Sequence, residues 1–148
     1  MTIGSNTFIS DSLLLLRSII ASGVSDPISG TRPTSSNFVM TDYPTRIATY
    51  PIITIKHQDF KTRRLGMRSE QNYVTMQVQV RVWARNEREK DHLTQEVYST
   101  LRTKQTDTGT GTIDNELFGF LVNSSVSVDE EGDKPKSKII QLQYNVIT

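Results

Sequence analysis

The segment from Tyr73 to Lys104 constrains the fold most strongly, because its hydrophobic period changes once near the middle. In YVTMQVQVRVWA, small apolar residues alternate with Tyr, Thr, Gln, Arg and Trp, which is the period of a strand with one buried face. In the following RNEREKDHLTQEVYSTLRTK, Leu93, Val97 and Leu101 recur every four residues, as on one side of an α-helix. A long strand is therefore expected to run directly into an amphipathic helix. The predicted buried face of the strand consists of Val74, Met76, Val78, Val80, Val82 and Ala84.

The start of this helix has a local chemical signal. Asn86 is a good N-cap residue, because its side-chain oxygen can accept from the first free backbone N–H groups. Glu89 follows three positions later, which completes a capping-box-like sequence. The strand is thus expected to end just before Asn86.

A second amphipathic helix is predicted near the N-terminus. The run from Asp11 to Ala21 has a broad apolar stripe, with Ser10 or Asp11 as its N-cap and Gly23 as its stop. We expect a structured helix here and not a secretory signal, because the first cation follows the apolar run. Residues 1–10 are expected to form an ordered arm or a frayed end.

The next part of the chain is predicted to contain two strands after an irregular connection. Ser25 to Asn37 holds two prolines, a glycine and many hydroxyls, which favours an extended connection, and NFVMTDYPTR after it can hold a short strand. Tyr50 to Phe60 reads as a strand, with Pro51 at its start. Its two faces are predicted to carry Ile53 and Ile55 on one side and Ile52 and Thr54 on the other.

The C-terminal part is predicted to be a surface loop followed by a β-hairpin. TDTGTGT, from Thr106 to Thr112, is a low-complexity turn. Two strands with alternating apolar residues follow, joined by DEEGDKPKS. Their single-parity apolar positions are Phe118, Phe120, Val122, Val126 and Val128 in the first strand, and Ile140, Leu142, Tyr144 and Val146 in the second.

These elements predict one α+β domain spanning residues 1–148, in the order α-β-β-β-α-β-β. An antiparallel or mixed sheet with both helices packed on one face would bury the two apolar stripes and leave the other sheet face polar. The 148-residue length is sufficient for one core without staples.

Composition excludes several function classes. There is no cysteine, so disulfides and thiolate chemistry are excluded, and no apolar run approaches the roughly 20 residues of a membrane span. The formal net charge of +1 argues against a strongly basic nucleic-acid binder. The two histidines, His57 and His92, are interpreted as exposed structural residues, and no metal-ligand or nucleophile motif accompanies them. We therefore expect no enzyme activity, no metal and no cofactor.

One cluster of charge stands out between the two central strands. In KTRRLGMRSEQN the cations are balanced only by Glu70, and Gly66 is the expected loop tip. Such a basic loop is suited to contacting phosphates, to pairing with acidic residues of a neighbouring subunit, or to keeping the loop soluble. The single tryptophan, Trp83, is interpreted as a core residue in preference to an interface anchor. The cations of the loop are Lys61, Arg63, Arg64 and Arg68.

The order of elements resembles that of tail terminator proteins, also called tail completion or neck proteins, of long-tailed viruses of bacteria and archaea. The resemblance is carried by the N-terminal LLLLRSII helix, the YPIITI strand, the basic loop, VTMQVQVRVWA running into a helix, and two final strands. It covers most of the chain.

This resemblance implies a structural virion protein that is assembled in the host cytoplasm. Its partners would be copies of itself in a ring, typically hexameric, the tail tube protein, and the head-tail connector or adaptor. The ring would stop tube polymerisation, join the tail to the head, and pass genomic DNA through its lumen without sequence-specific binding, with no membrane involved. The basic loop would face a neighbouring subunit, the tube or the channel. The polar strand face with Gln77, Gln79 and Arg81 would pack against other protein.

Two other functions remain open from the residues alone. A head-tail connector of the same neck would share the ring and differ only in its partners. A small nucleic-acid-binding protein would use the basic loop, and its DNA affinity would fall steeply with salt.

Overall fold

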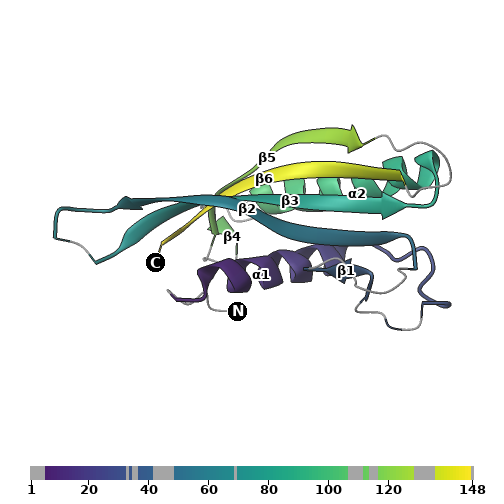
Figure 1. Cartoon of the computed structure of the whole chain (residues 1–148), viewed down its shortest axis with the longest axis horizontal. Helices are drawn as coiled ribbons and strands as arrows, with labels where there is room; N and C mark the ends of the chain where they lie inside the picture. The colour runs from purple at the N-terminus through teal and green to yellow at the C-terminus, as the bar shows by residue number, and fades with distance from the viewer. Residues whose placement is uncertain are drawn as a thin grey trace.

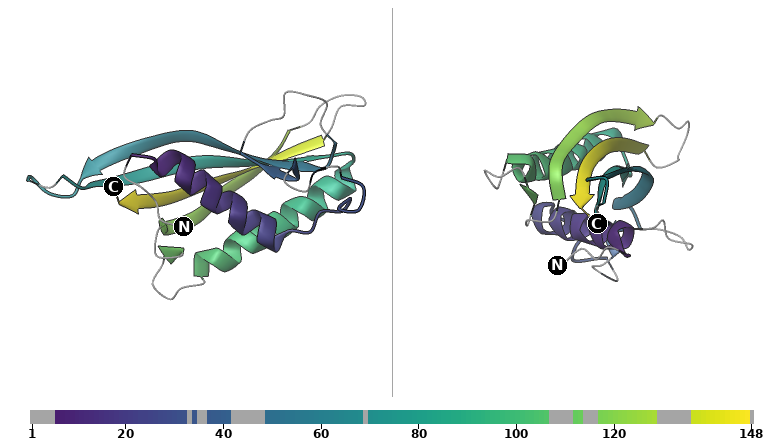
Figure 2. Two further views of the ribbon diagram at one scale, coloured as in Figure 1. Left: turned by 90° about the horizontal axis from the view of Figure 1, so that it is seen from below. Right: turned by 90° about the vertical axis from the view of Figure 1, so that its left-hand side faces the viewer.

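A computed structural model describes residues 6–32, 34, 37–41, 49–68, 70–106, 112–113, 117–128 and 136–147. In this part of the chain, six strands form one mixed sheet and two helices cover one of its faces (Figure 1, Figure 2). This arrangement confirms the predicted α+β class and the order of its main elements. The elements are α1 (Phe8–Gly23), β1 (Val39–Met40), β2 (Ile52–Arg64), β3 (Asn72–Ala84), α2 (Glu87–Thr106), β4 (Thr112–Ile113), β5 (Leu117–Val128) and β6 (Lys136–Ile147).

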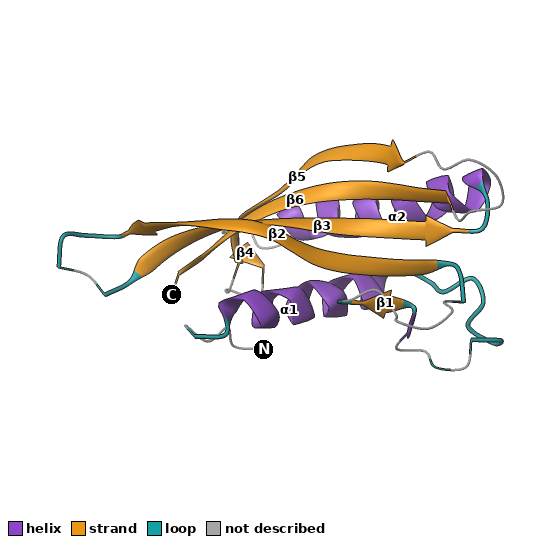
Figure 3. Ribbon diagram, in the orientation of Figure 1, coloured by secondary structure: helices purple, strands orange, loops and turns teal. Residues whose placement is uncertain are grey.

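The sheet order is β1-β2-β3-β6-β5-β4, so the two long hairpins β2–β3 and β5–β6 meet where β3 pairs with β6. β1 runs parallel to β2, and all other neighbours are antiparallel. The long strands are drawn in orange in Figure 3, where β2 and β3 continue well past the end of α1. The short strand β4 was not predicted, because two residues carry no readable alternation.

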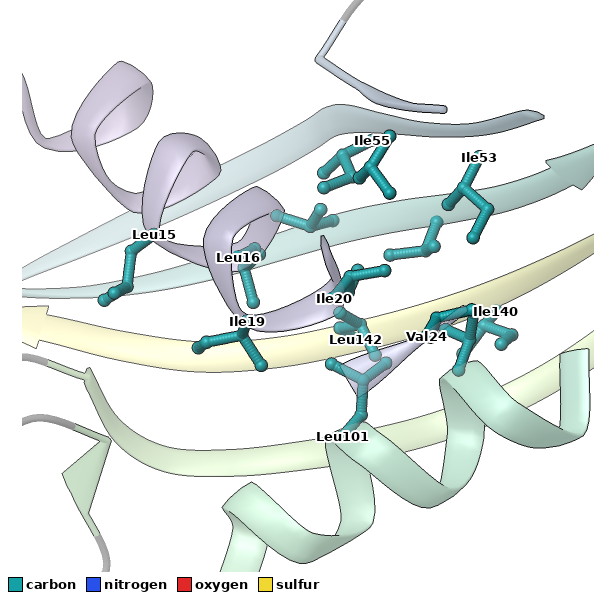
Figure 4. Packing of buried hydrophobic residues seen from close by; sticks show 14 of the residues in the cluster. Leu15, Leu16, Ile19, Ile20, Val24, Ile53, Ile55, Leu101, Ile140 and Leu142 are labelled. Atoms are coloured by element: carbon teal, nitrogen blue, oxygen red, sulfur yellow. The ribbon is translucent and has the colours of Figure 1, made fainter. Parts of the chain in front are cut away.

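The core lies between the sheet and the two helices, as the periodicities predict. The alternate residues of β3 from Val74 to Ala84 are at most 1% exposed, and the predicted stripe of α2 is fully buried. Figure 4 shows α1 side chains such as Leu16 and Ile20 directed towards β2 and β6, with Leu101 of α2 alongside. The predicted parity of β6 is confirmed too, by the burial of Ile140, Leu142, Tyr144 and Val146.

The turn from β3 into α2 follows the predicted capping closely. Asn86 Oδ1 accepts from the backbone N–H of Glu89 at 2.9 Å, and the first helical bond runs from Lys90 N–H to the Asn86 carbonyl. In a capping box the Glu89 side chain would accept from the backbone N–H of Asn86. Here the Glu89 carboxylate accepts instead from the backbone N–H and the guanidinium of Arg85. These bonds hold the pKa of Glu89 below its usual value, the Arg85 side chain being the largest cause.

The helix α1 starts earlier than predicted. It begins at Phe8, so Ser10 and Asp11 lie inside its first turn and neither is the N-cap. Thr7 precedes the helix, and its hydroxyl donates to the Asp11 carboxylate over 2.6 Å, which ties the first turn together. The predicted arm therefore loses Phe8 to Ser10 to the helix, and residues 1–5 lie outside the described chain. The predicted stop is right, since α1 ends at Gly23.

The predicted single parity of β5 is wrong. Its register against β6 shifts between Phe118 and Leu121 and again between Val122 and Ser124. Each shift inserts a residue, which reverses the face that later side chains occupy. Val122 consequently packs against the core, whereas Val126 is exposed.

The described part of the connection between α1 and β2 has no long helix or strand, as predicted, but it is organised around a buried arginine. The guanidinium of Arg32 forms a two-point ion pair with Asp26, at 2.5 and 3.1 Å, and donates to the carbonyls of Thr49 and Pro51. These contacts hold the connection against the start of β2. The predicted short strand is confirmed as β1, which pairs with Ile53 and Thr54 of β2.

Candidate interaction surface

The predicted basic loop is mostly strand. Lys61, Arg63 and Arg64 lie in β2, and only Arg68 lies in the turn that leads to β3. Sequence pattern missed this extension because the segment projects past α1, where both faces of the hairpin meet solvent and no apolar alternation is needed (Figure 1). The predicted tip at Gly66 is right, since it lies in the turn between the two strands.

The four cations are all exposed, but they do not form one flat patch. Lys61 and Arg63 pair with Thr75 and Tyr73, so they lie on the sheet face opposite the helices. The Arg63 guanidinium is 5.5 Å from the centre of the Tyr73 ring, a cation–π distance. Arg64 has the opposite parity in β2. The hairpin therefore presents positive charge on both faces and at its tip.

Exposed apolar side chains accompany these cations. Met67 at the tip is 95% exposed, and Leu65 and Phe60 are 45% and 43% exposed. The Phe60 ring meets the Phe8 ring of α1 edge to face at 5.5 Å, which supports the base of the hairpin. Large exposed apolar residues within a rim of charge are typical of protein-docking sites.

The open sheet face is mostly polar along β3, as predicted, with cross-strand contacts between its side chains. The apolar side chains of Leu121, Val126 and Ile147 are exposed on the same face. Gln77 and Gln79 pair directly with Gln143 and Gln141 of β6. Arg81 donates to the Ser137 hydroxyl at 2.9 Å, and its guanidinium stacks 3.9 Å from the centre of the Trp83 ring.

Trp83 corrects the prediction of a core tryptophan. It lies on the face away from the helices, half-buried, with its indole N–H donating to the Thr54 hydroxyl at 3.1 Å. Beside it lies a hollow of about 380 Å³, and the described residues that line it include the cations Lys56 and Arg81 and no carboxylate. The remaining lining residues are Thr41, Thr54, Ile55, Gln79 and Trp83.

The two histidines are separated by the fold. His57 lies on β2, half-buried against Phe60, and is therefore less exposed than predicted. Its Nε2 is buried and has no hydrogen-bond partner among the described residues. His92 is exposed on α2 as predicted, and its Nε2 lies 3.1 Å from a Glu96 carboxylate oxygen.

The described residues contain no cluster of three or more metal-ligating side chains. None of the described helices is long and apolar enough to cross a membrane. A second hollow, of about 410 Å³, lies between the end of α1 and α2, where it is lined by Gly23 together with His92, Gln95, Glu96, Ser99 and Thr100.

No protein-family model matches the chain, and no curated protein matches its sequence. The surface just described is therefore interpreted from its own chemistry.

Proposed function

We propose that this chain is a tail terminator subunit of a long-tailed virus. As a structural virion protein it would form a ring, typically of six copies, at the head-proximal end of the tail tube. The ring would stop tube polymerisation and join the tail to the head connector, with DNA passing through the lumen. The observation that carries the proposal is the β2–β3 hairpin, which extends past the helices with exposed cations and exposed apolar side chains.

The hairpin is suited to docking on protein. Met67 at its tip is 95% exposed and lies outside the described core cluster, so leaving it in water costs roughly 1.5–3 kcal/mol compared with full burial. Leu65, which is 45% exposed, adds a smaller cost of the same kind. A neighbouring subunit or the end of the tube can recover this free energy. Lys61, Arg63 and Arg68 around the tip would then set the orientation and the association rate.

The open sheet face supports the same proposal. Several of its side chains already have partners, because Arg81 donates to Ser137 and Thr75 donates to Asn145, so these side chains have less entropy to lose on binding. A pre-ordered polar face is suited to permanent contact with other protein.

A connector of the same neck is the nearest alternative, and only the identity of its partners distinguishes it. A small nucleic-acid-binding protein is the second, and the exposed cations Lys61, Arg63, Arg64 and Arg68 favour it. That alternative requires measurable affinity for free DNA, with log K falling linearly as log salt rises.

The test is to polymerise the tail tube protein of the same virus with and without this chain, and to measure tube length by electron microscopy. A terminator gives tubes with a ring at one end and no further growth at that end. The double variant R64Q/R68Q is expected to cap fewer tubes, because it removes two charges near the hairpin tip.

The matched control is R88Q/R102Q, which removes the same charge from exposed positions of α2. It should cap tubes as the unmodified chain does. Tubes that grow equally long with and without the unmodified chain would contradict the proposal. Tight, salt-sensitive binding of free DNA without capping would favour the nucleic-acid alternative.

A further inference from the structure

The sheet has two long outer strands that are only partly covered. Among the described residues, β1 pairs with β2 only at Ile53 and Thr54, and β4 pairs with β5 only at Leu117 and Phe118. Within the described chain, no strand pairs with the outer side of residues 55–64 of β2 or of residues 119–128 of β5. Both stretches present backbone N–H and C=O groups at a sheet edge.

The open stretches of β2 and β5 lie at the same level along the strand direction. Ile55 pairs with Val80, Val80 with Ile140, and Ile140 with Ser125, so Ile55 and Ser125 occupy one row across four strands. In the same way, the row that contains His57 reaches Val122. Several rows of paired residues therefore begin at an open edge of β2 and end at an open edge of β5.

The strand directions allow β2 of a second, rotated copy to pair with β5 of the first copy. β2–β3, β3–β6 and β6–β5 are all antiparallel, so β5 runs opposite to β2. A second copy, rotated about an axis along the strands, keeps the direction of its own β2. It would therefore present β2 antiparallel to β5 of the first copy, and the sheet would continue across the contact.

Charge selects this pairing over pairing of like edges at β2. The sequence of β5, LFGFLVNSSVSV, carries no charge, whereas the open part of β2 carries four cations, Lys56, Lys61, Arg63 and Arg64, and one carboxylate, Asp59. Two β2 edges would bring two stretches with an excess of positive charge together, and edge cations of this kind disfavour self-pairing. A neutral strand such as β5 meets no such repulsion.

We propose that the β5 edge of each copy pairs with the β2 edge of the next copy, with residues 121–125 near residues 55–60. Because the two edges differ, the contact is head to tail, and a head-to-tail contact that closes makes a ring in which no long sheet edge is left. The inference rests on the proposed function only for the closure into a ring. The partner at these edges is a second copy of the chain, and the contact consists of backbone hydrogen bonds between β5 of one copy and β2 of the next.

The absence of cysteine makes a cross-linking test clean. Gln58→Cys is placed on the β2 edge and Leu121→Cys on the β5 edge, both at exposed positions, and Leu121 lies in the row that contains Asp59, the neighbour of Gln58. A short thiol-to-thiol cross-linker is added to each single variant, to their mixture, and to the double variant, at high protein concentration. The control pairs Gln58→Cys with Ser99→Cys, an exposed position on α2.

The expected result is a covalent dimer from the mixture of single variants and a ladder of multimers from the double variant. Neither single variant alone should give a dimer, and the α2 control should give none. A dimer from Leu121→Cys alone would overturn the inference in favour of like-edge pairing. A chain that gives no cross-link at its highest soluble concentration would overturn it as well.

The two proposals fail differently. A ring of the expected mass without edge cross-links contradicts the β2–β5 ladder and leaves the terminator proposal standing. Cross-linked multimers that do not stop tube growth contradict the terminator proposal and leave the ladder standing.

Discussion

The hydroxyl of Tyr144 donates to the hydroxyl of Ser12 over 2.8 Å, joining β6 to α1 across 132 positions of sequence. Both residues are fully buried. Ser12 in turn donates to the carbonyl of Ile9 at 3.0 Å, so its lone pairs are free to accept from Tyr144. This buried polar pair thus links α1 to the sheet within an apolar core.

Substituting Ser12→Ala should destabilise the fold by about 1–3 kcal/mol, because the buried Tyr144 hydroxyl loses Ser12 as its acceptor. The free energy of unfolding in urea measures this. Tyr144→Phe in the Ser12→Ala background removes the hydroxyl that lost its acceptor and should recover part of the loss. A double variant no more stable than Ser12→Ala would contradict the stated role of the pair.

Alkaline pH should destabilise the protein through Tyr144. Burial raises the pKa of Tyr144 above its usual value, and the hydrogen bond to Ser12 offsets this only in part. The unfolded chain therefore loses this proton at a lower pH than the folded chain. The contribution is fully present below about pH 10, the usual tyrosine pKa, and is lost as the pH rises towards the raised value. Unfolding free energies against pH should fall less steeply in Tyr144→Phe.

Gly23 marks a close approach of the two helices. A Cβ at this position would overlap the Thr100 side chain of α2. Gly23→Ala should therefore destabilise the fold by about 1–3 kcal/mol, although alanine favours helix. Thermal unfolding measures the loss, and the double variant Gly23→Ala with Thr100→Ala should regain part of it. A Gly23→Ala protein as stable as the unmodified chain would mean that the helices separate without cost.

Arg32→Ala should destabilise the fold by about 3–5 kcal/mol, since it removes the buried partner of Asp26 and two carbonyl contacts. Burial alone would raise the pKa of Asp26, but its bonds from Arg32 and from the Ile28 N–H lower it. The stability from this pair is therefore present above about pH 4 and lost as the pH falls through the lowered value. Arg32→Lys should restore little, because lysine lacks the planar fork. Full stability in Arg32→Lys would contradict this explanation.

The parts of the fold that face the helices follow from the sequence. The alternation from Val74 to Ala84 and the four-residue spacing from Leu93 to Leu101 both arise because one side of each element meets the core. The cap at Asn86 is equally local. Where burial of one face determines the residue pattern, the sequence is sufficient to predict the helix or strand and its buried side.

The remaining features depend on contacts that no local pattern records. Residues 61–64 extend β2 because β3 pairs with them, and their charges mark solvent on both faces. The bulges of β5 shift Val126 to the surface through register alone. In the sequence, Arg32 resembles an ordinary loop cation, and only the structure shows that it bonds to Asp26 and to the Thr49 carbonyl. The seven candidate interface residues were found from charge and polarity, but their division between two faces needed the strand register.

The most direct measurement is the solution mass of the purified chain, combined with electron microscopy of the same sample. Assembly as proposed predicts a closed ring with about six times the 16.8 kDa chain mass, and loss of the ring in the Lys61, Arg63, Arg64 and Arg68 to glutamine variant. A chain that remains a 16.8 kDa monomer, even in the presence of tail tubes, would contradict the central claim.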